Sequence, residues 1–123
     1  MEFRAESDLL GELQVPKDAY YGVQTQRAIN NFKISNQYLY SFPALIKALG
    51  YVKKAAAQAN FELGILEEPI YKAIIQAGDE VIAGKMDKEF PIDMIQGGAG
   101  TSVNMNANEV IANRALELMG HQK

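Results

Sequence analysis

The sequence predicts a mainly α-helical fold with a small N-terminal β-hairpin and a short extended piece before the last helix. Residues 43–63, 67–83 and 101–119 repeat apolar side chains at intervals of three and four, the spacing of one helical face. Residues 3–16 instead roughly alternate polar and apolar side chains around DLLG, as a hairpin does. The segment FPIDMI, residues 90–95, contains a proline and predicts the extended piece.

Length and composition limit the classes of function. At 123 residues the chain is one ordinary domain or a piece of a larger protein. Its net charge of −3 argues against a nucleic-acid partner, which needs a basic patch. The absence of cysteine excludes disulfides and thiolate metal sites, and the one histidine, His121, is close to the end, so we expect no metal. No secretory signal and no membrane-length apolar run is present, and a cytoplasmic setting is expected.

The first third of the chain predicts short elements. The hairpin is closed by Pro16. A short helix is expected after Gly22, through Gln26 and Ala28, with Asp18 as a candidate cap. The following KISNQYLYSF, residues 33–42, is typical of a loop.

The middle of the chain predicts two antiparallel helices joined by a short loop. For the first, Ser41 is a candidate cap, Pro43 suits the first turn and Gly64 the stop. The second begins with acidic residues and Pro69, which suit a first turn, and ends at Gly84. The expected buried stripes are Leu45, Leu49, Val52, Ala56, Ala59 and Leu63 in the first helix, and Ile70, Ile74, Ala77 and Val81 in the second.

The last helix is expected from about Thr101 to Met119, with Gly120 as its stop. Its apolar stripe is Val103, Ala107, Ile111, Ala115 and Leu118. Other apolar residues, such as Ile75 and Ile82, lie outside the stripes. Three helices and a hairpin are not expected to cover all of this surface, which predicts contact with another domain or subunit.

The stretch QGGAGTSVNMNANEV, residues 96–110, carries the chemistry. Glycines allow a close backbone approach, and a helix start offers free N–H groups and a positive dipole end, so together they predict an anion site. Thr101 and Ser102 add hydroxyl donors there. Asn104 and Asn108 share a helical face with Thr101, which suits a buried neutral network that orients a small anion.

A structural interpretation stands beside this one. In this second interpretation the glycines serve only as a turn, Thr101 is an N-cap, and the asparagines are partners of buried backbone. Neither a Walker motif nor a dinucleotide fingerprint is present, and no Ser-His or paired-carboxylate arrangement stands out. Asp18, Asp79 and Glu109 are explicable as cap or surface residues.

Two blocks resemble the N-terminal domain of the aspartase/fumarase superfamily: VPKDAYYGVQTQRAINNFKIS and GGAGTSVNMNANEVIANRALELMGHQK. The resemblance runs from about Phe3 to Lys123. Class II fumarases typically carry a Gly-Ser-Gly-Thr loop and often a tryptophan in place of the YYG tyrosines. The GGAGTS loop and the YYG sequence therefore favour the aspartase branch.

The resemblance implies the helical N-terminal domain of the L-aspartase-like fold and a carbon–nitrogen lyase that converts L-aspartate reversibly to fumarate and ammonia. In this family a serine on a flexible loop takes the Cβ proton, and hydrogen bonds hold the resulting aci-carboxylate. No organic cofactor is needed. The enzymes are homotetramers in which each active site is shared among three subunits. The loop threonine, which binds the substrate carboxylate, corresponds to Thr101, with Ala99, Gly100 and Ser102 as its neighbours. Asn104 and Asn108 are orienting or structural residues.

The family's serine loop, its histidine segment and its lysine- and asparagine-containing motif have no counterpart in this sequence, so no residue is assigned a catalytic role. Residues 1–123 are expected to be a single N-terminal lyase domain of a much longer chain, without its central helical bundle and C-terminal domain. Two alternatives remain. One is a class II fumarase fragment acting on malate and fumarate, and the other is a non-catalytic domain that binds a carboxylate or a protein.

Overall fold

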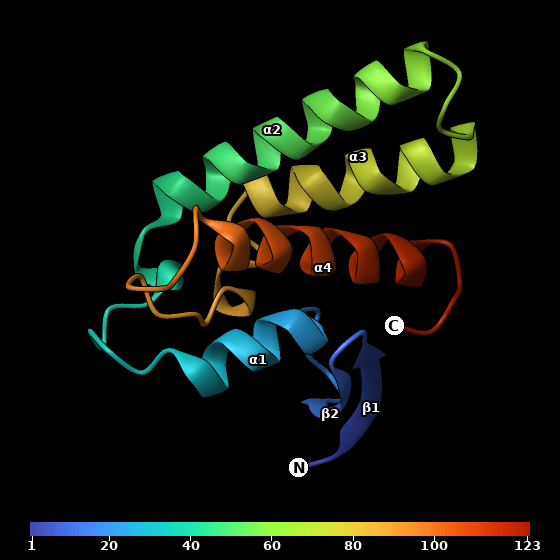
Figure 1. Cartoon of the computed structure of the whole chain (residues 1–123). Coiled ribbons are helices and arrows are strands. Elements are labelled where there is room, and N and C mark those ends of the chain that lie inside the picture. The colour runs from blue at the N-terminus through green and yellow to red at the C-terminus, as the bar shows by residue number, and fades with distance from the viewer.

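The computed structural model describes residues 1–123 and confirms the mainly helical fold with an N-terminal hairpin (Figure 1). The strands and helices are β1 (Phe3–Asp8), β2 (Gly11–Pro16), α1 (Val23–Asn31), α2 (Pro43–Glu62), α3 (Glu68–Ile82) and α4 (Thr101–Leu118). Two 3₁₀ turns, η1 (Leu39–Ser41) and η2 (Asp87–Glu89), lie between them. None of the helices combines the length and the apolar character needed to cross a lipid bilayer.

Helix α4 runs through the middle of the molecule (Figure 1). The predicted antiparallel pair of α2 and α3 stacks on one side of it, and α1 and the hairpin lie on the other. The two strands pair antiparallel with Phe3 opposite Pro16 and Asp8 opposite Gly11. The site at the start of α4 is therefore supported from both sides.

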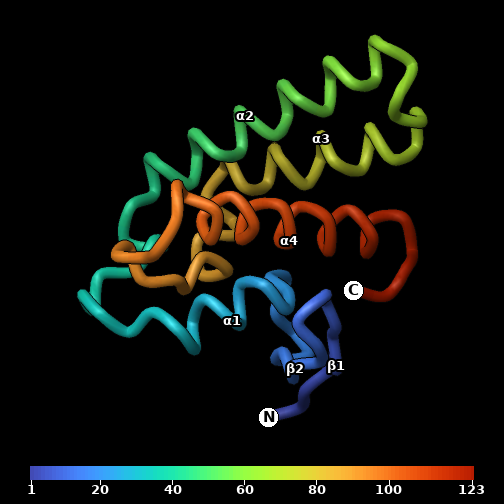
Figure 2. Tube along the Cα trace, in the orientation of Figure 1, coloured from blue at the N-terminus to red at the C-terminus, as the bar shows by residue number.

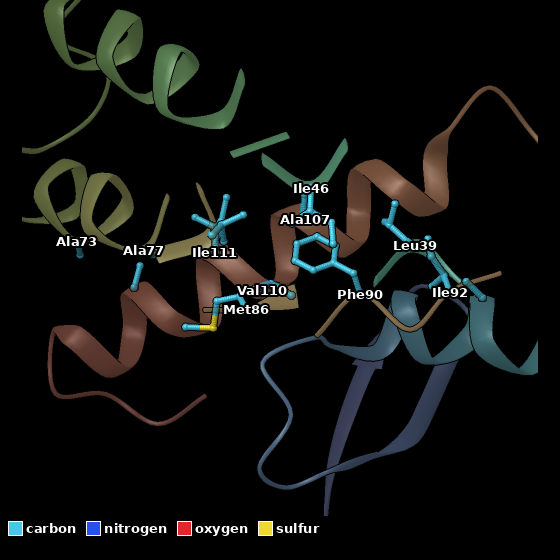
Figure 3. Packing of buried hydrophobic residues seen from close by; sticks show 13 residues of the cluster. Leu39, Ile46, Ala73, Ala77, Met86, Phe90, Ile92, Ala107, Val110 and Ile111 are labelled. Carbon is cyan, nitrogen blue, oxygen red and sulfur yellow. The ribbon is translucent and has the colours of Figure 1, made fainter. Parts of the chain in front are cut away.

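The core gathers around the middle of α4 (Figure 3). Phe90, Leu39 and Ile46 are fully buried there and come from three different segments. The predicted extended piece is confirmed and has a partner that the sequence did not reveal: Leu39 donates its N–H to the carbonyl of Ile92 at 2.9 Å. Met94 donates to the carbonyl of Gln37 at 2.8 Å. The segment expected to be a plain loop thus contains η1 and pairs with the extended piece.

The predicted buried face of α2 is wrong. Leu45, Val52 and Leu63 are 39%, 61% and 73% exposed. The buried face consists of Ile46, Gly50 and Ala57. Apolar residues occur around most of this helix, so periodicity cannot choose the packed side. Gly50 determines the packed side of α2. A Cβ atom at this position would lie 2.8 Å from Cγ1 of Ile82, so any larger residue would keep the backbones of α2 and α3 further apart.

The other helix predictions are largely confirmed. The stripes of α3 and α4 are mostly buried, with Ile70 exposed at the start of α3. Gly64, Gly84 and Gly120 follow their helices with φ of 72°, 80° and 82°, the left-handed conformation of a helix stop. The predicted cap Ser41 is wrong, because it belongs to η1 and Phe42 occupies the N-cap of α2 without a side-chain hydrogen bond.

Polar contacts attach the hairpin to the chain that follows it. The guanidinium of Arg4 donates to the carbonyls of Pro16, Lys17, Ala19 and Tyr21 at 2.8–2.9 Å. These four acceptors lie along the turn from β2 to α1. One side chain therefore fixes the path of that connection.

Helix α1 is capped by residues of other elements, and Asp18 is not its cap. Its N-cap is Gly22, which offers no side chain. Glu6 of β1 accepts the N–H of Val23 at 2.8 Å, and Glu109 of α4 accepts those of Gly22 and Gln24, each at 2.8 Å. The sequence allowed Glu109 to be either a cap or a surface residue. It is a cap, but it caps α1 and not its own helix α4. Asp79 is an exposed residue paired with Lys54.

Uncovered apolar surface, as predicted, remains on this fold. The large exposed side chains on and beside α2 and α3 are Leu45, Tyr51, Val52, Leu63, Ile65 and Ile70. Leu9 and Leu10 are also exposed at the tip of the hairpin. Most of them lie on α2 or in its loop to α3, so the uncovered surface is concentrated on that side of the fold.

We predict that Gly50→Ala destabilises the packing of α2 on α3. The added methyl meets Ile82 and Val81 at 2.8 and 3.2 Å, and such overpacking costs about 1–3 kcal/mol. That exceeds the gain in helix propensity of about 0.5–1 kcal/mol. The control is Gly97→Ala, where the added methyl would make only ordinary contact with the Phe32 ring at 3.7 Å. Denaturant unfolding should show the larger loss for Gly50→Ala, and equal losses would contradict this packing argument.

Candidate functional site

The glycine loop ends directly at the first residue of α4. Gly98 and Gly100 have φ of 83° and 84°, a conformation that side chains rarely adopt, and Gly100 is the N-cap. Residues 97–101 are all exposed, and Ser102 is half-buried. The loop thus presents backbone and hydroxyl groups to the surface at the positive end of the helix dipole, as the sequence predicted for an anion site.

Thr101 is not the cap of α4. It is the first helical residue, and no side-chain hydrogen bond closes this helix start. A Cβ atom placed on Gly98 would lie 3.6 Å from Oγ1 of Thr101, so the hydroxyl lies over the loop. The structural interpretation of Thr101 as an N-cap is therefore wrong. The structure brings Ala99, Gly100, Thr101 and Ser102 together at one exposed helix end.

Ser102 also lines a groove between α4, α1 and the hairpin tip, with a volume of about 700 Å³. The only cation in this groove is Arg27. Its guanidinium donates to both carboxylate oxygens of Asp8, at 2.9 and 2.7 Å, and to the carbonyl of Gly11 at 2.9 Å. This hydrogen bonding lowers the pKa of Asp8 and raises the pKa of Arg27. Because the pair is neutral overall, anion binding here would depend on the loop.

Asn104 and Asn108 do not form the buried network that the sequence predicted, and their orienting role stays a prediction. Asn104 is exposed, and its Oδ1 accepts from Nζ of Lys53 at 2.5 Å. Asn108 is half-buried, lies 3.5 Å from the sulfur of Met105, and lines a pocket of about 330 Å³ together with Lys53. The error has a tertiary cause, because α2 passes over this face of α4 and brings a lysine that the α4 sequence cannot reveal.

Two other asparagines satisfy backbone groups, as the structural interpretation held. Asn106 is fully buried and donates to the carbonyl of Glu89 at 2.8 Å. Asn113 donates to the carbonyl of Tyr20, also at 2.8 Å. These bonds tie α4 to η2 and to the segment before α1. Two of the four asparagines of α4 are therefore structural, because their amides bond to backbone carbonyls of neighbouring segments.

Sequence reasoning missed Asp93. It is 1% exposed, and its carboxylate accepts from Oγ of Ser35 at 2.6 Å. The backbone N–H groups of Ile34, Ser35, Asn36 and Ile95 donate to it as well, at 2.8–3.3 Å. The Ser35 hydroxyl is the main cause that holds the pKa of Asp93 well below its usual range. A signal was present, since a lone acid inside the apolar FPIDMI predicts a buried carboxylate with partners.

Several other ionisable side chains form surface and inter-helix pairs. Arg114 of α4 donates to both carboxylate oxygens of Glu80 on α3, at 2.6 and 2.9 Å. No group of three or more histidine, cysteine or carboxylate side chains is arranged to hold a metal ion. The chemistry at the start of α4 is therefore that of hydrogen-bond donors and a helix dipole.

Comparisons with known proteins point to lyases. A family model described as "Lyase" matches residues 11–123. An aspartate ammonia-lyase of a Bacillus species is 60% identical over 122 residues, 99% of this chain and 26% of that enzyme. A class II fumarate hydratase of Halobacterium salinarum is 58% identical over 121 residues, 98% of this chain and 25% of that enzyme.

Solved structures agree with the sequence relatives. The crystal structure of a fumarate lyase:delta crystallin from Brucella melitensis in native form superimposes with a TM-score of 0.96 at 55% identity. The superposition covers 98% of this chain and 28% of that one. The chain spans about a quarter of the length of the curated relatives it matches.

We predict that Gly100→Ala strains the loop while Gly97→Ala is tolerated. A Cβ on Gly100 meets no atom within 4 Å, so its cost is the left-handed backbone alone, about 1–2 kcal/mol. On Gly97 the added atom would make ordinary contact with the Phe32 ring at 3.7 Å, and the change should stay within about 0.5 kcal/mol. Thermal unfolding and amide exchange at Thr101 and Ser102 measure both variants. Equal behaviour of the two would show that the left-handed backbone does not matter.

Proposed function

The chain belongs to this lyase family, within the aspartase/fumarase superfamily, and from that premise we propose that it is the N-terminal part of an aspartate ammonia-lyase. The proposed enzyme converts L-aspartate reversibly to fumarate and ammonia. The observation that carries the proposal is the exposed GGAGTS loop at the N-terminus of α4, with the Thr101 hydroxyl lying over the loop and not capping the helix.

In this proposal the loop binds a carboxylate of the substrate. Thr101 donates its hydroxyl, Ser102 and the first backbone N–H groups of α4 supply further donors, and Ala99 and Gly100 let the substrate approach. The carboxylate next to Cβ gains negative charge when the Cβ proton leaves. Donors fixed at that oxygen stabilise the transition state more than the bound substrate, which is how they accelerate the reaction.

The other parts of the proposed enzyme lie outside these 123 residues. The serine that takes the Cβ proton, the central helical bundle and the C-terminal domain are proposed for a longer chain, in agreement with relatives about four times as long. We further propose a homotetramer in the cytoplasm, with each site shared among three subunits and no organic cofactor. The exposed apolar side chains of α2 and its loop to α3 support such contacts.

A class II fumarase is the second candidate. The Halobacterium salinarum fumarate hydratase is 58% identical, nearly as similar as the aspartate ammonia-lyases. The two reactions share fumarate and differ in the group that leaves, ammonia or water. Turnover of aspartate compared with malate by the full-length enzyme separates them.

We predict that Thr101→Ala in the full-length enzyme slows aspartate deamination about a hundred-fold to a thousand-fold, the usual effect of removing one such donor. Stability should change by less than about 0.5 kcal/mol, because Thr101 does not cap α4. Thr101→Ser keeps the hydroxyl and should retain much of the activity. Steady-state kinetics and thermal unfolding of both variants provide the test. Near-normal turnover of the alanine variant would remove Thr101 from the substrate site.

We also predict that residues 1–123 alone form no fumarate from aspartate. Removal of the Cβ proton needs a positioned base, and the proposal assigns that base to another part of the enzyme. Purified chain at high concentration should give no rise in fumarate absorbance, while the full-length enzyme serves as the positive control. Measurable turnover by the 123-residue chain would contradict the division of the site.

A further inference from the structure

The carboxylate of Asp93 is the last buried anchor of the chain before the glycine loop. This carboxylate accepts the N–H of Ile95 at 2.8 Å, and the side chain of Gln96 donates to the backbone carbonyl of Asp93, also at 2.8 Å. Gly97 follows at once. The anchor therefore stands directly at the entry to the loop that carries Thr101.

The same carboxylate holds a second segment, which is distant in sequence. Oδ2 of Asp93 accepts three consecutive backbone N–H groups, those of Ile34, Ser35 and Asn36. The Ser35 hydroxyl donates to Oδ1 of Asp93. An isolated bridge between Tyr38 and Asp93 and the Met94–Gln37 bond join the two segments further. In Figure 2 the trace between α1 and η1 passes beside the trace that leads into α4.

Between Gln96 and α4 few contacts fix the chain. Residues 97–100 are exposed and include three glycines, which have many accessible backbone conformations when unconstrained. A Cβ placed on Gly97 would lie 3.7 Å from the ring of Phe32, which shortly precedes the segment that Asp93 holds. The loop is thus fixed at its two ends, by the Asp93 anchor and by the first turn of α4, and not between them.

We infer that Asp93 is a positioning residue of the substrate site, which holds the glycine loop at the place where Thr101 meets the substrate carboxylate. The inference rests on the proposed function, and it assigns Asp93 no contact with substrate. A carboxylate suits this role because it only accepts, and five donors converge on it. An amide in its place would turn an NH₂ group against at least one of these donors.

The site explains why such an anchor would matter for catalysis. A displacement of about 1 Å can slow a reaction roughly a hundred-fold even when the altered residue is far from the chemistry. Loss of the anchor frees a loop whose glycines cannot restore its shape. The apolar core around Phe90 and Ile92 is non-directional and holds the segment without fixing the direction in which the loop leaves it.

The test uses the full-length enzyme with three variants. Asp93→Asn removes the charge with little change of volume, and Ser35→Ala removes only the hydroxyl donor. Glu80→Gln is the control, since it weakens another bonded carboxylate, the partner of Arg114 in the α3–α4 contact. The measurements are kcat and KM for aspartate, thermal unfolding, and amide exchange of residues 97–102.

Asp93→Asn is expected to lower kcat/KM about a hundred-fold with a raised KM. Ser35→Ala should also lower kcat/KM and raise KM, but only several-fold. The control should lower the melting temperature and leave KM unchanged, because partial unfolding reduces the amount of active enzyme without altering its affinity. Exchange of the loop amides should rise in Asp93→Asn and not in Glu80→Gln.

Unchanged KM and loop exchange in folded Asp93→Asn would overturn the inference. If that variant does not fold, Ser35→Ala decides, and unchanged KM there overturns it equally. If the unmodified enzyme does not act on aspartate, the proposed function fails. The loop exchange then still decides whether Asp93 positions the loop, so the two failures can be told apart.

Discussion

The closure of the α1 N-terminus by carboxylates from β1 and α4 is the interaction on which the arrangement of this fold depends. Glu6 and Glu109 together accept the N–H groups of the first turn of α1, which has no cap of its own. A Cβ on Gly22 would lie 2.7 Å from Oε2 of Glu6 and 3.0 Å from Cδ of Glu109. Only glycine leaves room for both carboxylates, and through them the hairpin, α1 and α4 are fixed to one another.

Asp93 makes the same kind of interaction beyond the other end of α1, where its carboxylate accepts backbone N–H groups of residues 34–36. In both places a carboxylate held by one segment accepts several backbone N–H groups of another, so the geometry is set by directional bonds rather than by apolar contact. Apolar burial supplies most of the driving force for folding, but it does not specify orientation. The two carboxylate clusters specify it, and the glycine loop lies beyond one of them.

The surface around the loop favours a site completed by other parts of a larger protein. The groove beside Ser102 has its single cation neutralised by Asp8, which leaves the loop and the helix dipole as the local attraction for an anion. The outer face of α2 is apolar and uncovered. Both features fit a domain that contributes one wall of a shared active site, as proposed for this lyase.

The sequence by itself determined the hairpin, the positions of the helices, their glycine stops and the exposed glycine loop with Thr101. Each of these depends on local properties: the period of apolar residues, the backbone freedom of glycine, and the free N–H groups of a helix start. The tertiary structure alone decided which face of α2 is buried, which asparagines are structural, and what the carboxylates of Glu109 and Asp93 hold. These depend on which distant segment arrives opposite a side chain, and the spacing of residues along one element contains no information about its neighbour.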